Sequence, residues 1–258
     1  MNIKEFKKNI LKVIKPSTKL FSIKNKNFYL ETECLFGESF EIEKIENDYC
    51  YGKLLTDDYL GWVNFKHLGD VPEASHRVLS IRTIIHEKDN IKSIPISYLP
   101  LGSQTHIISE STDWFEIFLN QNKISSGFVP KNHLNHISEE ILDWVSIAET
   151  LINTPYKWGG RDSLGIDCSA LVQLSLQAGG MKIARNSSQQ KLFNRLKLTK
   201  LKDVKRGNLI FWEGHVGIII NQKEMIHSNA FKMMVSIDKT SEVIKKISKP
   251  FNIYKIIN

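Results

Sequence analysis

One cysteine and two histidines in the second half of the chain could together perform nucleophilic catalysis. They are Cys168, His215 and His227. A cysteine attacks as the thiolate, which is favoured by the positive end of a helix and by a neighbouring imidazolium. Taken alone, Cys168 would more often be a structural thiol, because free cysteine is among the most buried residue types. The elements around these residues decide between the two interpretations.

The residues around Cys168 place it at the start of a helix. A turn at residues 165–167 precedes the cysteine, and the segment CSALVQLSLQA that follows has helical periodicity. Leu171 and Val172 share a face with the cysteine. Gly179 and Gly180 then supply a stop signal for the helix.

The two histidines belong to segments that are typical of neighbouring strands. His215 begins HVGIIIN, and His227 lies within EMIHSNA. Antiparallel neighbours can bring two side chains together although they are distant in sequence. Further strands are predicted at GNLIFW, MVSI and NIYKII. Because helices come first and adjacent strands follow, the pattern indicates an α+β domain with an antiparallel sheet.

Two further helices are predicted in the same domain. The segment SEEILDWVSIAETLIN begins with Ser138 as a suitable N-cap and is stopped by Pro155. Its apolar face would consist of Ile141, Leu142, Val145, Ala148, Leu151 and Ile152. A shorter helix is predicted over SSQQKLFNRL, with Ser187 or Ser188 as its N-cap.

Residues 140–258 resemble the NlpC-type cysteine peptidases, which have a papain-like fold and cut bacterial cell-wall peptides. The resemblance is carried by TPYKWGGRDSLGIDCSALVQ, RGNLIFWEGHVGIII and MIHSNA, in this order. It implies that Cys168 is the nucleophile, that His215 is the general base, and that His227 orients His215. It also implies that the backbone N–H of Cys168 contributes to an oxyanion hole.

The same resemblance implies four substrate-binding residues in this domain, which are Asp167, Ser169, Trp158 and Ser187. Each also has a structural interpretation. Asp167 is a good N-cap for the helix, and capping can coexist with a contact to substrate. Trp158 could pack on the adjacent glycine turn, and the two serines could be ordinary first-turn or capping residues.

The first half of the chain contains an internal repeat. GWVNFKHL at residues 61–68 returns as GFVPKNHL at residues 127–134, an offset of 66, and two upstream segments match with an offset of 65. Each copy consists of short alternating segments separated by turn residues, which is typical of a small all-β barrel. The copies resemble bacterial SH3-like barrels.

Two residues of the first copy are implied substrate contacts through the family resemblance. Tyr59, in a Y-x-G-W setting, resembles a tyrosine that helps to hold the free amine of L-alanine. Glu38, in the FGE turn, is a candidate for a carboxylate on that amine. Tyr59 could instead belong to the barrel core, and Glu38 could be a solvated turn residue.

These observations predict a multidomain chain: two small all-β SH3-like barrels followed by an α+β papain-like cysteine peptidase domain with an antiparallel sheet. An N-terminal extension would cover residues 1–14. The first barrel would cover residues 15–72, the second barrel residues 73–137, and the peptidase domain residues 138–258.

The composition favours a globular protein without a cofactor. The net charge is +7, but only six of the 35 basic residues are arginine, and the lysines are dispersed, which indicates solvated surface rather than a nucleic-acid site. No apolar run approaches the ~18 residues of a membrane span. Neither zinc-type cysteine spacing nor a phosphate-binding loop is present, so we expect no metal, no cofactor, no nucleic acid and no membrane.

An odd count of three cysteines and no recognisable signal peptide favour a cytoplasmic location. We therefore expect a cysteine endopeptidase that hydrolyses the γ-D-glutamyl–diamino acid bond of murein peptides (L-Ala-γ-D-Glu-diamino acid). The free N-terminal L-alanine would be recognised, and the role would be cell-wall recycling. The alternatives are an inactive cell-wall-peptide-binding protein and an amidase or acyltransferase on the same scaffold. The oligomeric state is left open.

Overall fold

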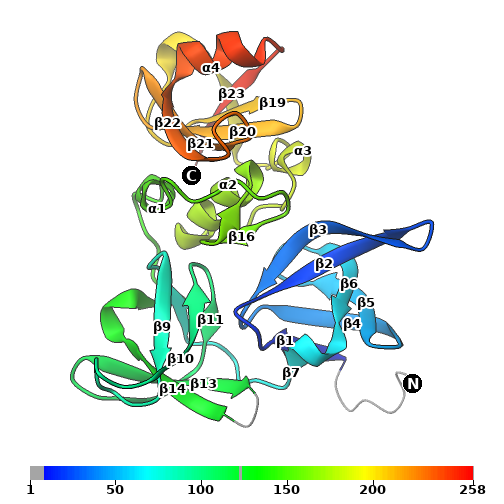
Figure 1. Cartoon of the computed structure of the whole chain (residues 1–258). Coiled ribbons are helices and arrows are strands. Elements are labelled where there is room, and N and C mark those ends of the chain that lie inside the picture. The colour runs from blue at the N-terminus through cyan, green and yellow to red at the C-terminus, as the bar shows by residue number, and fades with distance from the viewer. Residues whose placement is uncertain (1–8, 122–123, 258) are drawn as a thin grey trace. The chain divides into compact units, whose positions relative to one another are not determined.

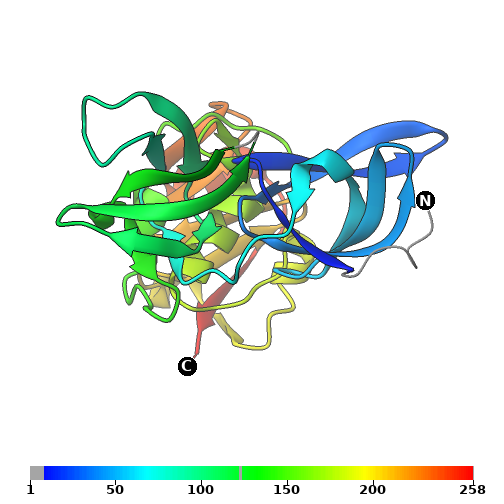
Figure 2. The same cartoon turned by 90° about the horizontal axis from the view of Figure 1, so that it is seen from below.

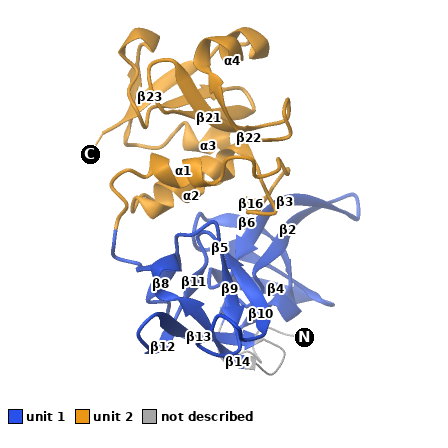
Figure 3. Ribbon diagram, turned by 60° about the vertical axis from the view of Figure 1, so that its left-hand side comes forward, with its two compact units in different colours: residues 1–139 blue, residues 140–258 orange. Residues whose placement is uncertain are grey.

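A computed structural model of the chain describes residues 9–121 and 124–257. Residues 1–8 of the predicted N-terminal extension therefore lie outside the described residues. The chain divides into two compact units, residues 1–139 and residues 140–258 (Figure 3). Unit 1 is built of strands and short 3₁₀ turns, whereas unit 2 combines strands with α-helices (Figure 1).

Unit 1 begins with a strand-rich region, residues 10–69, which we call copy 1. Its elements are β1 (Ile10–Val13), β2 (Ser17–Lys24), β3 (Asn27–Leu35), β4 (Ser39–Glu46), β5 (Tyr49–Leu54), β6 (Tyr59–Asn64), η2 (Phe65–His67) and β7 (Leu68–Gly69). The strands form one sheet in the order β3-β2-β6-β5-β4-β1-β7. The long β2–β3 hairpin extends away from the rest of this sheet (Figure 1, Figure 2).

The first strand corrects the predicted start of this region. β1 pairs with β4 and with β7, so residues 10–13 are part of the sheet. The prediction that residues 1–14 form an extension is therefore wrong for these residues. Their side chains alternate between exposed and buried positions only weakly, which is why the strand was not predicted from its pattern.

The second strand-rich region, residues 76–136, is copy 2. Its elements are β8 (His76–Val78), β9 (Arg82–His86), β10 (Pro95–Pro100), β11 (Gln104–Thr105), β12 (Ile107–Glu110), β13 (Trp114–Gln121), β14 (Ile124–Pro130), η3 (Lys131–His133) and β15 (Leu134–His136). These strands form two sheets, in the orders β10-β9-β14-β13-β12 and β11-β8-β15.

The two copies repeat the same strand pairing. β5 pairs with β6 in copy 1 as β13 pairs with β14 in copy 2, and β1 pairs with β7 as β8 pairs with β15. Even a single bridge recurs, between Phe21 and Trp62 in copy 1 and between His86 and Phe128 in copy 2. The repeat in the sequence is therefore also a repeat of structure.

Each copy has its own apolar core at equivalent positions. Six pairs of core residues lie 65 or 66 positions apart: Val13 and Val78, Leu20 and Ile85, Cys34 and Leu99, Leu54 and Leu119, Val63 and Val129, Leu68 and Leu134. One residue breaks the symmetry, because Phe36 of copy 1 belongs to the core of copy 2. At the same place the Gln104 N–H donates to the Phe36 carbonyl at 2.9 Å.

Unit 2 is an α+β domain with an antiparallel sheet, as predicted. Its elements are α1 (Val145–Thr150), β16 (Arg161–Asp162), β17 (Gly165–Ile166), α2 (Cys168–Ala178), α3 (Ser187–Gln190), β18 (Leu196–Thr199), η4 (Leu201–Asp203), β19 (Leu209–Trp212), β20 (His215–Ile219), β21 (Glu224–Asn229), β22 (Met234–Lys239), α4 (Thr240–Ile247) and β23 (Asn252–Ile256). The six-stranded sheet has the order β18-β23-β19-β20-β21-β22. It lies between α2 and α4 (Figure 1, Figure 3). Across residues 9–121 and 124–257, no helix is long and apolar enough to cross a membrane.

Helix α2 is the central helix of unit 2, and its bounds agree with the predicted segment. Every residue except Gln177 is buried, which explains why the apolar pattern is broad rather than one-sided. The helix ends at Gly179, and Gly180 has a φ of +76°, a conformation that favours glycine. The predicted stop signal is confirmed.

The helix predicted from Ser138 starts later than expected. α1 begins at Val145, so Ser138 is not its N-cap. The predicted apolar face fails at Leu142, whose side chain is 94% exposed. The carboxylate of Asp143, just before the helix, accepts from Arg206 at 2.8 and 2.9 Å.

The second predicted helix is reduced to one turn. α3 spans four residues, and its N-cap position is Asn186 rather than Ser187 or Ser188. The segment after it contains Leu192, but this side chain is 80% exposed, so no buried apolar face prolongs the helix there. Its last residue, Gln190, is buried and donates to the Ser169 carbonyl at 2.8 Å.

Candidate active site

Cys168 is the first residue of α2, at the end of the helix where unpaired backbone N–H groups gather. Its side chain is 8% exposed. The backbone groups of Val216 and Ser169 act to lower the pKa of this thiol. Because Val216 directly follows His215, the fold brings the thiol to the strand that carries the first histidine.

The surroundings keep both groups neutral in the free protein. Burial raises the pKa of the Cys168 thiol to about 11, and the Asp167 carboxylate acts in the same direction. Burial, together with the neighbouring His227, lowers the pKa of His215 to about 3. An uncharged imidazole beside a thiol can accept the thiol proton as the sulfur attacks.

His215 and His227 lie side by side on adjacent strands. His215 opens β20, His227 lies within β21, and the two strands are antiparallel neighbours. The Nε2 atom of His215 is 2.8 Å from the Nδ1 atom of His227. The ring of Trp212 packs against the ring of His215, with 5.7 Å between the two centroids. His215 is thus held between a hydrogen bond and an aromatic contact.

Asp167 is the N-cap of α2. Its Oδ1 accepts from the Ala170 N–H at 2.8 Å and from the Ser169 hydroxyl at 3.1 Å. Its Oδ2 accepts from the Gly159 N–H at 3.0 Å. The capping interpretation is confirmed, whereas a contact between Asp167 and substrate stays a prediction.

Arg185 completes this cluster and was not predicted from the sequence. Its Nη1 and Nη2 atoms donate to the two oxygens of Asp167 at 3.0 and 2.6 Å, and Nη1 also donates to Ser169 Oγ at 2.7 Å. Arg185 is 1% exposed, so the bidentate ion pair is buried. The one available signal was the choice of arginine in a chain whose basic residues are mostly lysine.

The three other predicted contacts of unit 2 take different positions. Ser169 is buried, and its hydroxyl is used by Asp167 and Arg185. Trp158 is 70% exposed, so it is open to solvent, and this exposure does not decide between packing on the glycine turn and a contact with substrate. Ser187 opens α3 and is partly buried. The roles of these residues toward substrate stay predictions.

Two predicted contacts belong to unit 1. Tyr59 packs partly on the core of copy 1, and its hydroxyl donates to Glu31 Oε2 at 3.1 Å. Glu38 is 2% exposed and accepts from the Leu35 N–H at 2.7 Å, so its interpretation as a solvated turn residue is wrong. The carboxylate that meets Tyr59 is therefore Glu31, which the sequence pattern did not single out.

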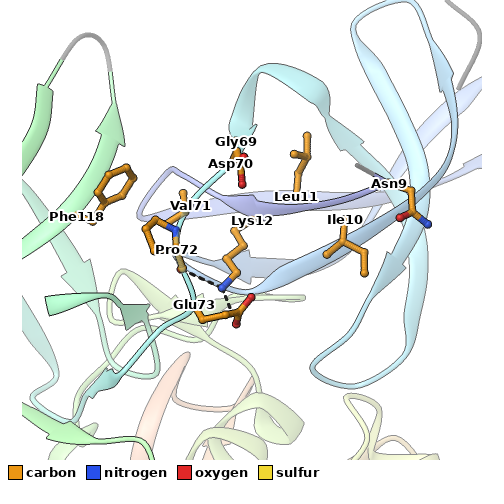
Figure 4. Close-up of a pocket in the computed structure, with 10 residues that line it drawn as sticks. All are labelled: Asn9, Ile10, Leu11, Lys12, Gly69, Asp70, Val71, Pro72, Glu73 and Phe118. Carbon is orange, nitrogen blue, oxygen red and sulfur yellow. Dashed lines mark hydrogen bonds and ion pairs between the residues drawn. The ribbon is translucent and has the colours of Figure 1, made fainter. Parts of the chain in front are cut away.

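A pocket of ≈ 770 Å³ in unit 1 contains none of the predicted site residues (Figure 4). It is lined by β1, by residues 69–73 and by Phe118. Lys12 crosses it, with its Nζ 2.9 Å from a Glu73 carboxylate oxygen and 3.1 Å from the Pro72 carbonyl. Its described lining includes neither a cysteine nor a histidine, so it does not compete with the site on α2.

Comparison with known families separates the two units. Residues 153–249 match the NlpC/P60 family model. Unit 2 carries an NlpC/P60 domain. Residues 28–68 match the bacterial dipeptidyl-peptidase SH3 domain, so copy 1 is the SH3 domain that precedes it. Copy 2 lies outside both ranges, and its identity as a second SH3-like barrel stays a prediction that the repeated strand pairing supports.

Two relatives extend the similarity over most of the chain. Dipeptidyl-peptidase 6 of Lysinibacillus sphaericus is 25% identical over 83% of this chain and 85% of that protein. The gamma-D-glutamyl-L-lysine dipeptidyl-peptidase of Bacillus subtilis is 24% identical over 83% of this chain and 77% of that protein. A crystal structure of an NlpC/P60 family protein from Bacillus cereus has a TM-score of 0.77 at 17% identity, covering 89% of this chain and 94% of the other. That likeness concerns the fold.

The NlpC/P60 domain contains every predicted site residue of unit 2. The predicted membership of this cell-wall peptidase family, within the cysteine peptidases, is confirmed. The assignment of catalytic and substrate-binding roles to single residues stays a prediction.

Proposed function

We propose that the chain is a cysteine endopeptidase that hydrolyses the γ-D-glutamyl–diamino acid bond of murein peptides. The observation that carries this proposal is the arrangement of Cys168 at the start of α2, next to the strand of His215, which is paired with His227. A thiol at a helix N-terminus beside an oriented imidazole suits attack on an amide carbonyl.

In the first half-reaction, the sulfur of Cys168 forms a bond to the γ-carbonyl carbon of D-glutamate. His215 takes the thiol proton as this bond forms. The carbonyl oxygen becomes negative near the N-terminus of α2, where the Cys168 N–H would donate to it. The C–N bond then breaks, and His215 gives its proton to the departing amine of the diamino acid.

In the second half-reaction, water attacks the carbonyl carbon of the thioester. His215 takes a proton from the water, the C–S bond breaks, and the sulfur recovers a proton from His215. The products are the dipeptide L-Ala-γ-D-Glu and a peptide that begins with the diamino acid.

The choice of bond is supported by the relatives. The Bacillus subtilis relative is named for a γ-D-glutamyl-L-lysine bond, and both long relatives are named dipeptidyl-peptidases. Release of a dipeptide from the amino end requires that the chain's free amine be recognised. We infer the same class of cleavage here, with the identity of the diamino acid left to the substrate panel below.

We infer that Tyr59 and Glu31 recognise this amine. A hydroxyl and a carboxylate 3.1 Å apart offer the acceptors that an ammonium group requires, and Ser22 holds the same carboxylate at 2.5 Å. Asp167 is a second carboxylate, but it already accepts five hydrogen bonds within unit 2. It has little capacity for a further donor.

We further propose that the substrates are small wall fragments and that the role is recycling in the cytoplasm. The support is the sparse and odd count of three cysteines, which does not indicate a disulfide framework. Disulfide frameworks belong to oxidising compartments, so this cysteine count favours a reducing one.

Mass spectrometry of the products from a panel of murein peptides tests the proposal. Peptides with a free L-alanine amine should release L-Ala-γ-D-Glu, and peptides with an acetylated amine should react far more slowly. Equal cleavage of both would contradict the role of Tyr59 and Glu31, and a different product would indicate an amidase or acyltransferase.

Cys168→Ala should abolish the reaction, whereas Cys34→Ala serves as the matched control.

Alkylation by iodoacetamide separates an enzyme from a protein that only binds peptides. We expect faster labelling at Cys168 than at Cys34 and Cys50, which are both buried in the core of copy 1. Burial also raises the pKa of Cys50 to about 12, which suppresses its thiolate. His215→Ala should slow the labelling of Cys168. Labelling of Cys168 no faster than that of Cys50 would favour a binding protein.

A further inference from the structure

The second histidine has a partner of its own on the next strand. His227 is buried, and its Nε2 atom is 3.2 Å from Asp238 Oδ2. The sheet register explains the contact: His227 of β21 lies opposite Ser236 of β22, and Asp238 is two residues further on the same face. His227 is thus in contact with His215 through one nitrogen and with a carboxylate through the other.

The carboxylate of Asp238 is held in place as an acceptor. Its Oδ1 accepts from Lys232 Nζ at 2.5 Å, and its Oδ2 accepts from Ser236 Oγ at 2.6 Å. Ser236 Oγ is itself held by Asn229 Nδ2 at 2.9 Å. Although partial burial acts to raise it, these hydrogen bonds hold the pKa of Asp238 below its ordinary value. The group therefore stays ionised and has no proton to donate.

An acceptor at this position dictates the tautomer of His227. A neutral imidazole carries one N–H, and only a protonated Nε2 can bond to an ionised carboxylate. The Nδ1 atom of His227 is then an acceptor, so His215 must donate its Nε2–H across the 2.8 Å contact. The Nδ1 atom of His215 keeps its lone pair, which is the site that can take the proton of Cys168.

Burial is the main reason that His227 stays neutral. Burial lowers the pKa of His227, Asp238 acts to raise it, and the ammonium groups of Lys232 and Lys246 act to lower it. Glu242 is the remaining acidic group at the ≈ 220 Å³ pocket that borders His227. A neutral His227 matters because a second N–H would point at His215 and remove the acceptor.

We propose that Asp238 is a positioning residue that fixes His227 as the Nε2–H tautomer and, through it, leaves His215 able to accept the proton of Cys168. This inference rests on the proposed cysteine peptidase function, but the tautomer itself can be observed without substrate.

Asp238→Asn gives the sharpest test, because Lys232 dictates how the new amide lies. The NH₂ group is repelled by the Lys232 ammonium and so takes the position that faces His227 and Ser236 Oγ. There Ser236 Oγ can turn its proton away and accept, and the NH₂ group demands an acceptor at His227 Nε2. We expect proton–nitrogen NMR correlations of isotope-labelled histidine to show protonated Nε2 in the original chain and protonated Nδ1 in the variant. The kcat should fall by roughly tenfold or more with little change in KM, since a wrong tautomer blocks proton transfer rather than binding.

Two further variants keep the test decisive. Asp238→Glu retains a carboxylate and should keep the Nε2–H tautomer and recover part of the lost kcat. Glu242→Gln changes a carboxylate at the same pocket without a contact to His227 and should leave the tautomer and kcat unchanged. Retention of the Nε2–H tautomer in a folded Asp238→Asn protein would overturn the inference. Absence of hydrolysis in the original chain, with the expected tautomers in both proteins, would instead contradict the proposed function.

Discussion

The buried histidine pair makes the stability of unit 2 depend on pH. An unfolded histidine takes up a proton as the pH falls through about 6.5, whereas burial holds the pKa of folded His215 at about 3. Between these values the unfolded chain binds more protons than the folded domain. Stability is therefore present above pH 6.5 and is lost progressively as the pH falls toward 3.

Thermal unfolding at pH 7 and pH 5 checks this expectation. The melting temperature of the original chain should fall between these values, and His215→Gln should reduce that fall because glutamine does not titrate. His106→Gln, a change at a half-buried position of unit 1, should leave the difference in melting temperature between the two pH values as it was. An identical fall in the His215→Gln protein would show that other groups govern the acid response.

The buried ion pair between Arg185 and Asp167 should be important for folding. Arg185→Ala leaves the Asp167 carboxylate buried without its counter-ion, which should lower the free energy of unfolding by about 3–5 kcal/mol. Arg195→Ala, at an exposed position of the same unit, should change it by less than about 0.5 kcal/mol. Urea unfolding of the two variants provides the comparison, and equal stabilities would contradict a structural role for the pair.

The sequence was sufficient to predict the candidate trio but not the residues behind it. Cys168, His215 and His227 sit in patterns that predict a helix start and two strands. Arg185 lies in the loop between α2 and α3, and Asp238 lies on β22. Their contacts with the site depend on how this loop and this strand pack against α2 and β21. No local spacing encodes such contacts, because the charge partner of a buried residue is set by tertiary packing.

At the scale of elements, one glycine turn couples the two copies of unit 1. Gly37 has a φ of +81°, and a Cβ there would lie 1.9 Å from the backbone carbonyl oxygen of Gln104. Gly214 also has a positive φ, +77°, but a Cβ there would meet nothing within 4 Å. Gly214→Ala should therefore destabilise by about 1 kcal/mol from backbone strain alone, and Gly37→Ala by about 3 kcal/mol or more.

Urea unfolding measures this difference. The midpoint of each glycine variant is compared with the midpoint at which the same unit unfolds in the original chain. Because the backbone conformation is similar at both positions, the excess loss in Gly37→Ala reports the steric clash with Gln104. Equal losses would mean that the copies can separate at this turn without cost.

Strands were predicted more reliably than helix ends. The five strands expected in the peptidase domain are all present, because each combines β-branched or aromatic residues with turn signals. The helix from Ser138 failed at its first half, where Leu142 faces outward and Asp143 pairs with Arg206. An apolar residue at the right spacing does not show whether anything covers it, and that information is absent from periodicity.

At the scale of the whole molecule, a single aromatic side chain makes copy 2 depend on copy 1. Phe36→Ala should leave a cavity in the core of copy 2 and lower its stability by about 3–5 kcal/mol. Hydrogen exchange should show the loss of protection in β9, β13 and β14 rather than in β4 and β5. Leu54→Ala, in the core of copy 1, should give the opposite pattern. A loss confined to copy 1 in the Phe36 variant would contradict the assignment.

The placement of Phe36 bears on how this tandem arrangement can be inherited and reused. Two adjacent copies of one sequence pattern look like interchangeable modules that recombination could shuffle singly. A gene segment that began at residue 73 would transplant copy 2 without the phenylalanine that fills its core. The recipient would acquire copy 2 with a cavity in its core, so the two copies of this protein are transferable only as a pair.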